Sequence, residues 1–165
     1  MSADWHSKKI WSHEDLECMN WRECQIFGMA FYKDKKELAI DTEYIFECLE
    51  PAENDEFFTL IRSPVTLVFE EVRNLEVSLF YCETNISSLE RLPIDPTDAD
   101  CKCDWLSDWR IDCYDGEIII RASGFKMFVR APALANGYRT LEDRGGICFD
   151  RYFSGDDSFL GRDSQ

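Results

Sequence analysis

Hydrophobic and polar residues alternate along much of the chain, as they do in β-strands that bury one face. The clearest stretch is residues 37–48, where even positions are mostly apolar and odd positions carry four carboxylates. The even positions are Leu38, Ile40, Thr42, Tyr44, Phe46 and Cys48. The acidic odd positions are Glu37, Asp41, Glu43 and Glu47. Because successive side chains of a strand point to opposite faces, we predict a half-buried strand with an acidic outer face.

Short runs of β-branched and aromatic residues extend this pattern to other parts of the chain. Further strands are predicted at residues 25–32, 57–62, 65–72, 75–79 and 85–92. The polar residues 33–36 predict a hairpin turn after the first of these strands, and Gly28 inside it indicates a bulge. Ser63 and Pro64 separate the next two strands, and residues 93–100 have the composition of a loop.

The dipeptide Asp115-Gly116 is typical of a two-residue turn and predicts a hairpin centred on it. The cross-strand pairs that this turn predicts are Tyr114 with Glu117, Cys113 with Ile118, Ile111 with Ile120, and Trp109 with Ala122. All the apolar residues then share one face, which supports this register. The same register places Arg110 opposite Arg121, a mildly unfavourable pair of like charges.

The pattern changes after Gly124, where the apolar positions switch from even to odd numbers. A β-bulge at this glycine would produce such a switch. Residues 133–141 predict a short helix before Gly145 and Gly146. We expect the polar tail from Ser154 to fray.

Together these elements predict a mainly β fold: a single-domain antiparallel β-sandwich or barrel, with a short helix or irregular segment at the C-terminus. A chain of 165 residues, 45% of them hydrophobic, is the size of one domain with its own core. Within this single domain of residues 1–165 we expect an N-terminal arm at residues 1–20, a β core at 21–130 and a C-terminal segment at 131–165.

The formal net charge of −15 is concentrated in one part of the chain. Residues 37–117 hold 21 acidic and 5 basic side chains, whereas the remainder is nearly neutral. Such a charge repels phosphate backbones and attracts basic proteins. We therefore expect no direct binding of nucleic acid, and a basic protein partner.

The compartment is predicted from hydropathy and from the cysteines. The longest uncharged run, residues 24–32, is far shorter than the roughly 20 residues that cross a bilayer. The N-terminus lacks the apolar stretch of a signal peptide. We therefore expect a cytoplasmic protein with no membrane association, in which the eight cysteines are thiols.

Three segments resemble segments of small uncharacterised bacterial β-rich proteins. They are WRECQIFG at residues 21–28, SPVTLVFEEV at 63–72 and GEIIIRASGF at 116–125. The likeness covers most of residues 21–130 and consists of strands punctuated by glycine and proline. The resemblance implies a bacterial or phage-type cytosolic protein and implies no activity.

Catalytic motifs are missing from the sequence. It contains no nucleophile elbow, P-loop, zinc-protease motif or dinucleotide-binding glycine pattern. Its two histidines, His6 and His13, both lie in the N-terminal arm, far in sequence from any nucleophile that they would serve. We therefore expect no enzyme, assign no catalytic residue and predict no cofactor.

Metal binding is not predicted either. Cys101 and Cys103 form a single close pair, whereas a structural zinc site needs two such pairs. Four acidic residues match a calcium loop in charge but lack its glycine and its final glutamate: Asp95, Asp98, Asp100 and Asp104. Cys48 and Cys113 fit the inward positions of their strands, so we expect them in the core.

The leading hypothesis is a non-catalytic protein-binding module, of immunity-protein or inhibitor type, that recognises a basic protein through a carboxylate-rich face. The predicted partner-binding residues are Glu37, Asp41, Glu43, Glu47, Asp98, Asp100, Asp104, Trp105 and Asp108. For Trp105 the alternative is a core position beside Trp109. Two other functions stay open: a small β-barrel that holds an apolar ligand, and a carboxylate- or metal-dependent hydrolase.

Overall fold

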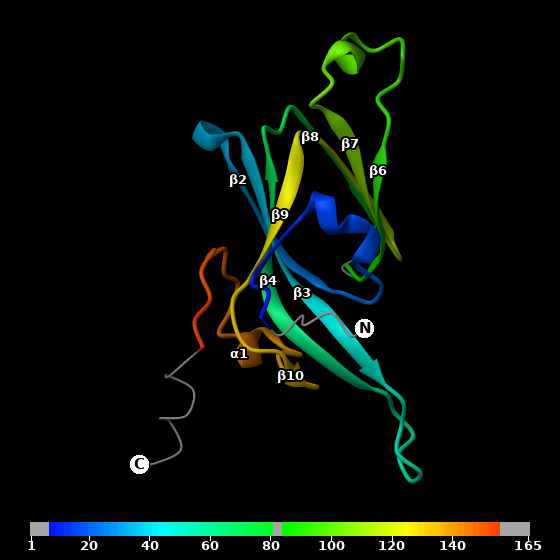
Figure 1. Ribbon diagram of the computed structural model, residues 1–165, viewed down its shortest axis with the longest axis vertical. Coiled ribbons are helices and arrows are strands. Elements are labelled where there is room, and N and C mark those ends of the chain that lie inside the picture. The colour runs from blue at the N-terminus through cyan, green and yellow to red at the C-terminus, as the bar shows by residue number, and fades with distance from the viewer. Residues whose placement is uncertain (1–6, 81–83, 156–165) are drawn as a thin grey trace.

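The computed structural model describes residues 7–80 and 84–155, which form two antiparallel sheets in an open, sandwich-like arrangement (Figure 1). The larger sheet has the order β1-β9-β4-β3-β2, and β10 also pairs with β4. Its strands are β1 (Ile10–Ser12), β2 (Ile26–Tyr32), β3 (Glu37–Leu49), β4 (Thr59–Glu70), β9 (Gly124–Val129) and β10 (Leu134–Ala135). The predicted mainly β fold is therefore confirmed, as an open sandwich rather than a barrel.

The smaller sheet has the order β5-β8-β7-β6. Its strands are β5 (Asn74–Leu79), β6 (Ile86–Leu92), β7 (Ser107–Cys113) and β8 (Gly116–Ala122). The helices are short: η1 (His13–Cys18), η2 (Lys33–Lys35), η3 (Ala99–Lys102) and α1 (Leu141–Arg144). No helix within residues 7–80 and 84–155 is long and apolar enough to cross a membrane.

The core fills the space between the two sheets. The ring of Trp109 on β7 lies 5.5 Å from that of Phe125 on β9 and 6.5 Å from that of Phe69 on β4, and all three side chains are fully buried. The alternation in β7 and β8 also buries the faces that were predicted. Aromatic contacts between strands of different sheets therefore hold the sandwich together.

The register of the β7–β8 hairpin differs by two residues from the prediction. Ile111 pairs with Ile118 rather than with Ile120, so the turn lies one residue earlier than expected. A shift of two residues keeps the same face inward, which is why the burial pattern was still correct. The observed register sets Asp108, rather than Arg110, opposite Arg121, and their side chains form an ion pair at 2.8 Å. An attractive pair thus replaces a repulsive one.

The switch of apolar positions at Gly124 is confirmed, but it has a different cause. β8 belongs to the smaller sheet and β9 to the larger one, so the chain passes from one sheet to the other at Ser123. Phe125, Met127 and Val129 are buried as predicted. The change of parity therefore marks a transfer between sheets rather than a bulge inside one strand.

Gly124 also lies directly beneath the N-terminal arm. A Cβ atom at this position would stand 2.2 Å from Nδ1 of His13, whose ring packs against Trp109 and Phe125. We expect Gly124→Ala to lower the free energy of unfolding by about 1–3 kcal/mol in urea denaturation, because the imidazole has to move. In a His13→Ala background the same substitution should cost almost nothing; an equal cost there would rule out this contact as the cause.

The N-terminal arm contributes a strand to the larger sheet, and the hairpin of β2 and β3 forms as predicted. β1 lies inside the segment expected as an arm and pairs with β9. The turn at residues 33–36 and the bulge near Gly28 are both confirmed. His6 lies outside the described residues.

β4 is one continuous strand where two were predicted. Pro64 lies inside it, opposite Glu43, and its carbonyl accepts from the backbone N–H of Arg130 on the opposite side. The N–H and C=O of a strand residue point to the same side, so the position that lacks a donor faces away from β3. Pro64 therefore removes no bond from the β3–β4 ladder. On its other side, β9 has already ended at Val129.

The C-terminal segment crosses the outside of the larger sheet. The helix predicted at residues 133–141 is wrong: this stretch contains β10, and α1 begins only at Leu141. Thr140 caps α1 at its start and Gly145, at φ 77°, ends it. The hydroxyl of Thr66 on β4 then donates to the carbonyl of Asp150 at 2.6 Å. Most of the tail expected to fray, residues 156–165, lies outside the described residues.

Candidate functional site

The acidic face predicted for β3 is not a solvent face. Asp41 is 0% exposed and Glu43 is 2% exposed. Arg130 and Arg144 both donate to Oδ1 of Asp41, Arg130 at 2.6 Å, and the backbone N–H of Cys148 donates to Oδ2 at 3.0 Å. The prediction that Asp41 and Glu43 face a partner is therefore wrong, because the chain's own arginines and C-terminal segment cover them.

The neighbouring carboxylates of this row are paired in the same way. Nη1 of Arg62 donates to both carboxylate oxygens of Glu43, at 3.1 and 3.0 Å. Arg151 donates to Glu37, which is half-buried. Buried charges are tolerated when they are paired in this way. Of the four acids predicted on this face, only Glu47 is exposed.

A second set of predicted acids lies at the far end of the molecule, in the loop between β6 and β7 and at the start of β7 (top of Figure 1). There Arg121 donates to Asp98 at 2.8 Å, to Asp100 at 3.1 Å and to Asp108 at 2.8 Å. The backbone N–H of Asp100, followed by Arg121, holds the pKa of Asp98 below its ordinary value. Three of the predicted binding residues therefore form ion pairs with Arg121 of the same chain.

Trp105 and Asp104 at this end are exposed, as a binding role requires. Trp105 is 46% exposed and lies beneath the guanidinium of Arg73, 5.0 Å from the ring centre. The alternative of two core tryptophans is wrong, because Trp105 precedes the first residue of β7 and its strand alternation. In the described part of the chain, no three His, Cys, Asp or Glu side chains are placed to share a metal ion.

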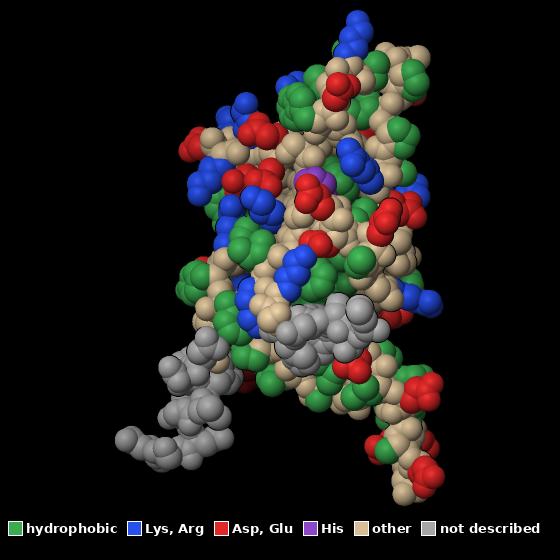
Figure 2. All heavy atoms as spheres, viewed as in Figure 1, with side chains coloured by type: hydrophobic (Ala, Val, Ile, Leu, Met, Phe, Trp, Pro, Cys, Tyr) green, Lys and Arg blue, Asp and Glu red, His purple; other side chains and the backbone are tan. Residues whose placement is uncertain are grey.

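The most exposed acidic feature is the hairpin that joins β3 to β4. It projects from one end of the larger sheet (lower right in Figure 1), and acidic and hydrophobic side chains gather on it in Figure 2. Five carboxylates on it are exposed: Glu47, Glu50, Glu53, Asp55 and Glu56. Within residues 7–80 and 84–155, none of them forms an ion pair. We call residues 47–58 the acidic hairpin.

Two phenylalanines stand beside these carboxylates. Phe57 is 79% exposed and Phe58 is 57% exposed, and Leu49 on the facing strand is 41% exposed. The sequence prediction placed both phenylalanines at the start of a strand and missed their exposure. One signal was present, because consecutive residues of a strand point to opposite faces and two adjacent phenylalanines cannot both enter the same core.

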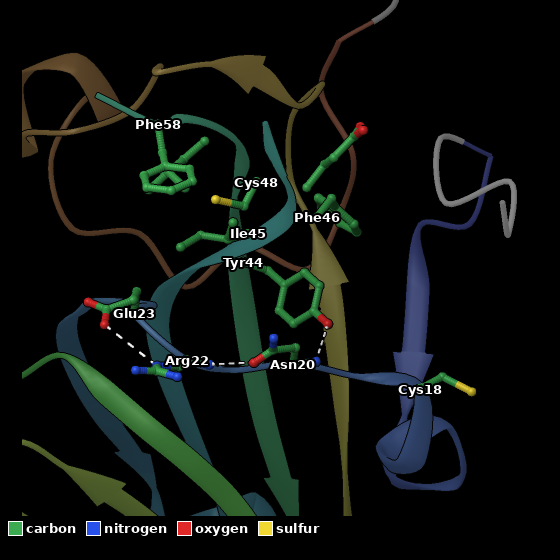
Figure 3. Close-up of a pocket in the computed structure, with 11 residues that line it drawn as sticks. Cys18, Asn20, Arg22, Glu23, Tyr44, Ile45, Phe46, Cys48 and Phe58 are labelled. Atoms are coloured by element: carbon green, nitrogen blue, oxygen red, sulfur yellow. Dashed lines mark hydrogen bonds and ion pairs between the residues drawn. The ribbon is translucent and has the colours of Figure 1, made fainter. Parts of the chain in front are cut away.

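A groove of about 590 Å³ opens at the base of the acidic hairpin (Figure 3). One wall is the segment before β2, with Asn20, Arg22 and Glu23, and the other is the end of β3 with part of β4. The residues that line it are Cys18, Asn20, Arg22, Glu23, Tyr44, Ile45, Phe46, Glu47, Cys48, Phe58 and Leu60. Its size is in the range of pockets that bind ligands, about 300–1,000 Å³.

Some side chains of the groove are hydrogen-bonded within the chain, and Cys48 is exposed. The hydroxyl of Tyr44 accepts from the backbone N–H of Asn20 at 2.8 Å, and burial raises the pKa of that phenol to about 12. Glu23 accepts a hydrogen bond from Tyr114. Cys48 is exposed, and its predicted core position is wrong, because this end of β3 continues past β2 towards the hairpin.

The cysteines give a test of these burial assignments. Every cysteine that the structure describes is a free thiol. Burial raises the pKa of Cys24 to about 12 and that of Cys113 to about 11. At pH 7.5 we expect iodoacetamide to modify Cys18, Cys48 and Cys101 in the folded protein, as read by mass spectrometry. Cys24 and Cys113 should react only in urea; their modification without urea would contradict the burial described here.

Comparison of the chain with protein-family models, with curated proteins and with solved structures finds no match. The resemblance to small bacterial β-rich proteins therefore stays a prediction. The function is inferred below from the geometry of the acidic hairpin and its groove.

Proposed function

We propose that this chain is a non-catalytic protein-binding module that captures a basic protein through the acidic hairpin. One observation carries the proposal: five carboxylates without a cationic partner among the described residues share one hairpin with the exposed Phe57 and Phe58. Large aromatic side chains at the centre of a patch and charges at its rim are the usual composition of a binding hot spot.

The two kinds of side chain have separate roles in this proposal. Like charges gathered on one hairpin repel one another, and a cationic surface would relieve that repulsion and speed association. Burial of a phenylalanine that was exposed contributes about 1.5–3 kcal/mol, so Phe57 and Phe58 supply affinity that salt does not screen. The carboxylates select the partner, and the phenylalanines hold it.

The type of partner follows from the charge. Strongly basic protein surfaces are commonly those that bind nucleic acid, because phosphate contacts need Lys and Arg. An acidic hairpin that covers such a surface would block it, in the manner of an immunity protein or inhibitor. A cytoplasmic location is part of this proposal.

The geometry gives less support to the two other functions. An apolar ligand inside the fold would need space between the sheets, where Trp109, Phe69 and Phe125 are fully buried and in contact. A hydrolase would need two free carboxylates in a cleft. In the groove, Glu47 is free among the described residues, but Glu23 accepts a hydrogen bond from Tyr114. The buried Asp41 and Glu43 both bind arginines. The acidic hairpin therefore favours protein binding.

The test is capture of basic proteins from a lysate of the encoding organism, identified by mass spectrometry. In the hairpin variant, Glu50, Glu53, Asp55 and Glu56 are replaced by lysine, which changes the net charge from −15 to −7. We expect the wild type to retain a basic protein at low salt, and the hairpin variant to lose it. Retention should weaken as salt rises, because exposed charges are screened over about 8 Å at physiological ionic strength.

A matched control separates the site from the overall charge. Four exposed acids outside the hairpin, Glu14, Glu17, Asp34 and Glu71, are replaced by lysine to give the same net charge of −7. This control should retain the captured protein. Equal loss in both variants would show that net charge alone attracts the protein, and capture of no basic protein by the wild type would refute the proposed function.

A further inference from the structure

We infer that the groove receives an extended basic segment of the partner, which adds as a strand to the free edge of β3. The inference rests on the proposed function, since it states how the captured protein docks. Addition of a strand to an exposed sheet edge is a common mode of peptide recognition, in which main-chain hydrogen bonds supply affinity and side-chain pockets supply specificity.

The edge of β3 is free because β2 ends early. The last β2–β3 pair is Ile26 with Thr42, and the backbone N–H of Glu43 then donates to the carbonyl of Gln25 at 3.3 Å. From Tyr44 onwards, β3 has β4 on one side and no strand on the other among the described residues. The backbone N–H of Ile45 still donates to the sulfur of Cys24, so the free edge begins beyond Ile45. The groove follows this edge (Figure 3).

The backbone of Cys48 points into this free edge. Its partner on β4 is Leu60, whose N–H donates to Oδ1 of Asn136 at 3.2 Å and whose carbonyl accepts from the N–H of Asn136 at 2.8 Å. Both backbone groups of Leu60 thus face away from β3. In an antiparallel ladder such a pair shares no hydrogen bond, so the N–H and C=O of Cys48 also face outward.

The side chains along the groove suit alternating residues. In Figure 3, Ile45 and Cys48 point to the side of β3 where Phe58 lies, and Tyr44 and Phe46 point to the other side. An added strand would place successive side chains on these two faces. Both faces offer aromatic rings, which bind apolar groups and also attract lysine and arginine.

The charge around the groove selects a basic occupant. Glu47 lines it, and the acidic hairpin continues from it with four more exposed carboxylates. Across the groove, Arg22 and Glu23 lie 3.9 Å apart and offset each other's charge. An extended segment rich in Lys or Arg therefore gains from this field, whereas an acidic one is repelled.

The probe is a synthetic peptide, acetyl-(Lys-Val)4-amide, with acetyl-(Glu-Val)4-amide as its acidic counterpart. Binding is measured by isothermal titration calorimetry at low salt for the wild type, Cys48→Ala and Cys48→Pro. Proline removes the outward N–H of residue 48 and leaves the β3–β4 ladder its bonds, whereas alanine keeps the N–H. We expect Cys48→Pro to weaken binding of the basic peptide at least tenfold, Cys48→Ala to stay within twofold, and the acidic peptide not to bind.

A second readout needs no variant. The amide hydrogen of Cys48 in the wild type should exchange more slowly with deuterium when the basic peptide is bound, because a strand on this edge would accept from it. Failure of the basic peptide to bind, equal affinity of the two Cys48 variants, or unchanged exchange at Cys48 would each overturn strand addition. If the hairpin variant still loses the captured protein in that case, the proposed function stands and only this mode of docking is wrong.

Discussion

Replacement of Asp41 by asparagine should lower the free energy of unfolding by about 3–5 kcal/mol, the range measured when one member of a buried ion pair is removed. Asparagine has nearly the same shape but no charge. Arg130 and Arg144 both converge on Oδ1 of Asp41, and the Arg144 side chain is fully enclosed. The variant would leave two buried cations without this counter-charge. Urea denaturation followed by circular dichroism measures the change.

The matched control is Glu37→Gln on the same strand face. Glu37 pairs with Arg151, whose side chain is 33% exposed, so the pair is partly solvated. Partly exposed ion pairs contribute about 1 kcal/mol or less. A similar small loss for both variants would contradict the view that Asp41 is the buried centre that fixes the C-terminal segment to β3.

Alanine substitution of Phe57 and Phe58 should have the largest effect on binding. Hot-spot residues contribute about 2 kcal/mol or more, which is roughly a 30-fold loss of affinity for each single variant. Both side chains are mostly exposed in the free protein, so their removal should change the free energy of unfolding by no more than about 0.5 kcal/mol. Isothermal titration calorimetry with the captured basic protein measures the first quantity, and urea denaturation the second.

Phe31→Ala is the control for this prediction. Phe31 on β2 is 54% exposed, similar to Phe58, but lies outside the acidic hairpin and its groove. Its removal should leave the affinity unchanged. An equal loss with Phe31→Ala, or no loss with either hairpin variant, would show that the phenylalanines do not anchor the partner.

The fold could be predicted where the information is local. Alternation identified β3, β7 and β8 and the faces that they bury, because a period of two follows directly from strand geometry. Register and continuity depend on contacts that are distant in sequence. Pro64 was read as a break because its position opposite Glu43, with the missing N–H turned away from β3, is visible only in the assembled sheet.

Of the predicted binding residues, only Glu47 lies on the acidic hairpin. The acidic row of β3 has the pattern of a solvent-facing strand, yet three of its four counter-ions, Arg130, Arg144 and Arg151, come from about 90 to 115 residues further along the chain. The sequence contained a hint, since residues 118–151 hold six basic and three acidic side chains. An acidic strand and a basic segment in one chain can bind each other as well as an external partner.

Hydrogen–deuterium exchange of this chain, alone and with the captured basic protein, tests the central claim most directly, because it compares the two acidic ends of the molecule in one experiment. If the acidic hairpin and its groove form the binding surface, slower exchange will be confined to residues 44–60 and to the facing segment at residues 18–23. Slower exchange in the loop at residues 93–106, with the hairpin unchanged, would place the partner on the opposite end and contradict the account.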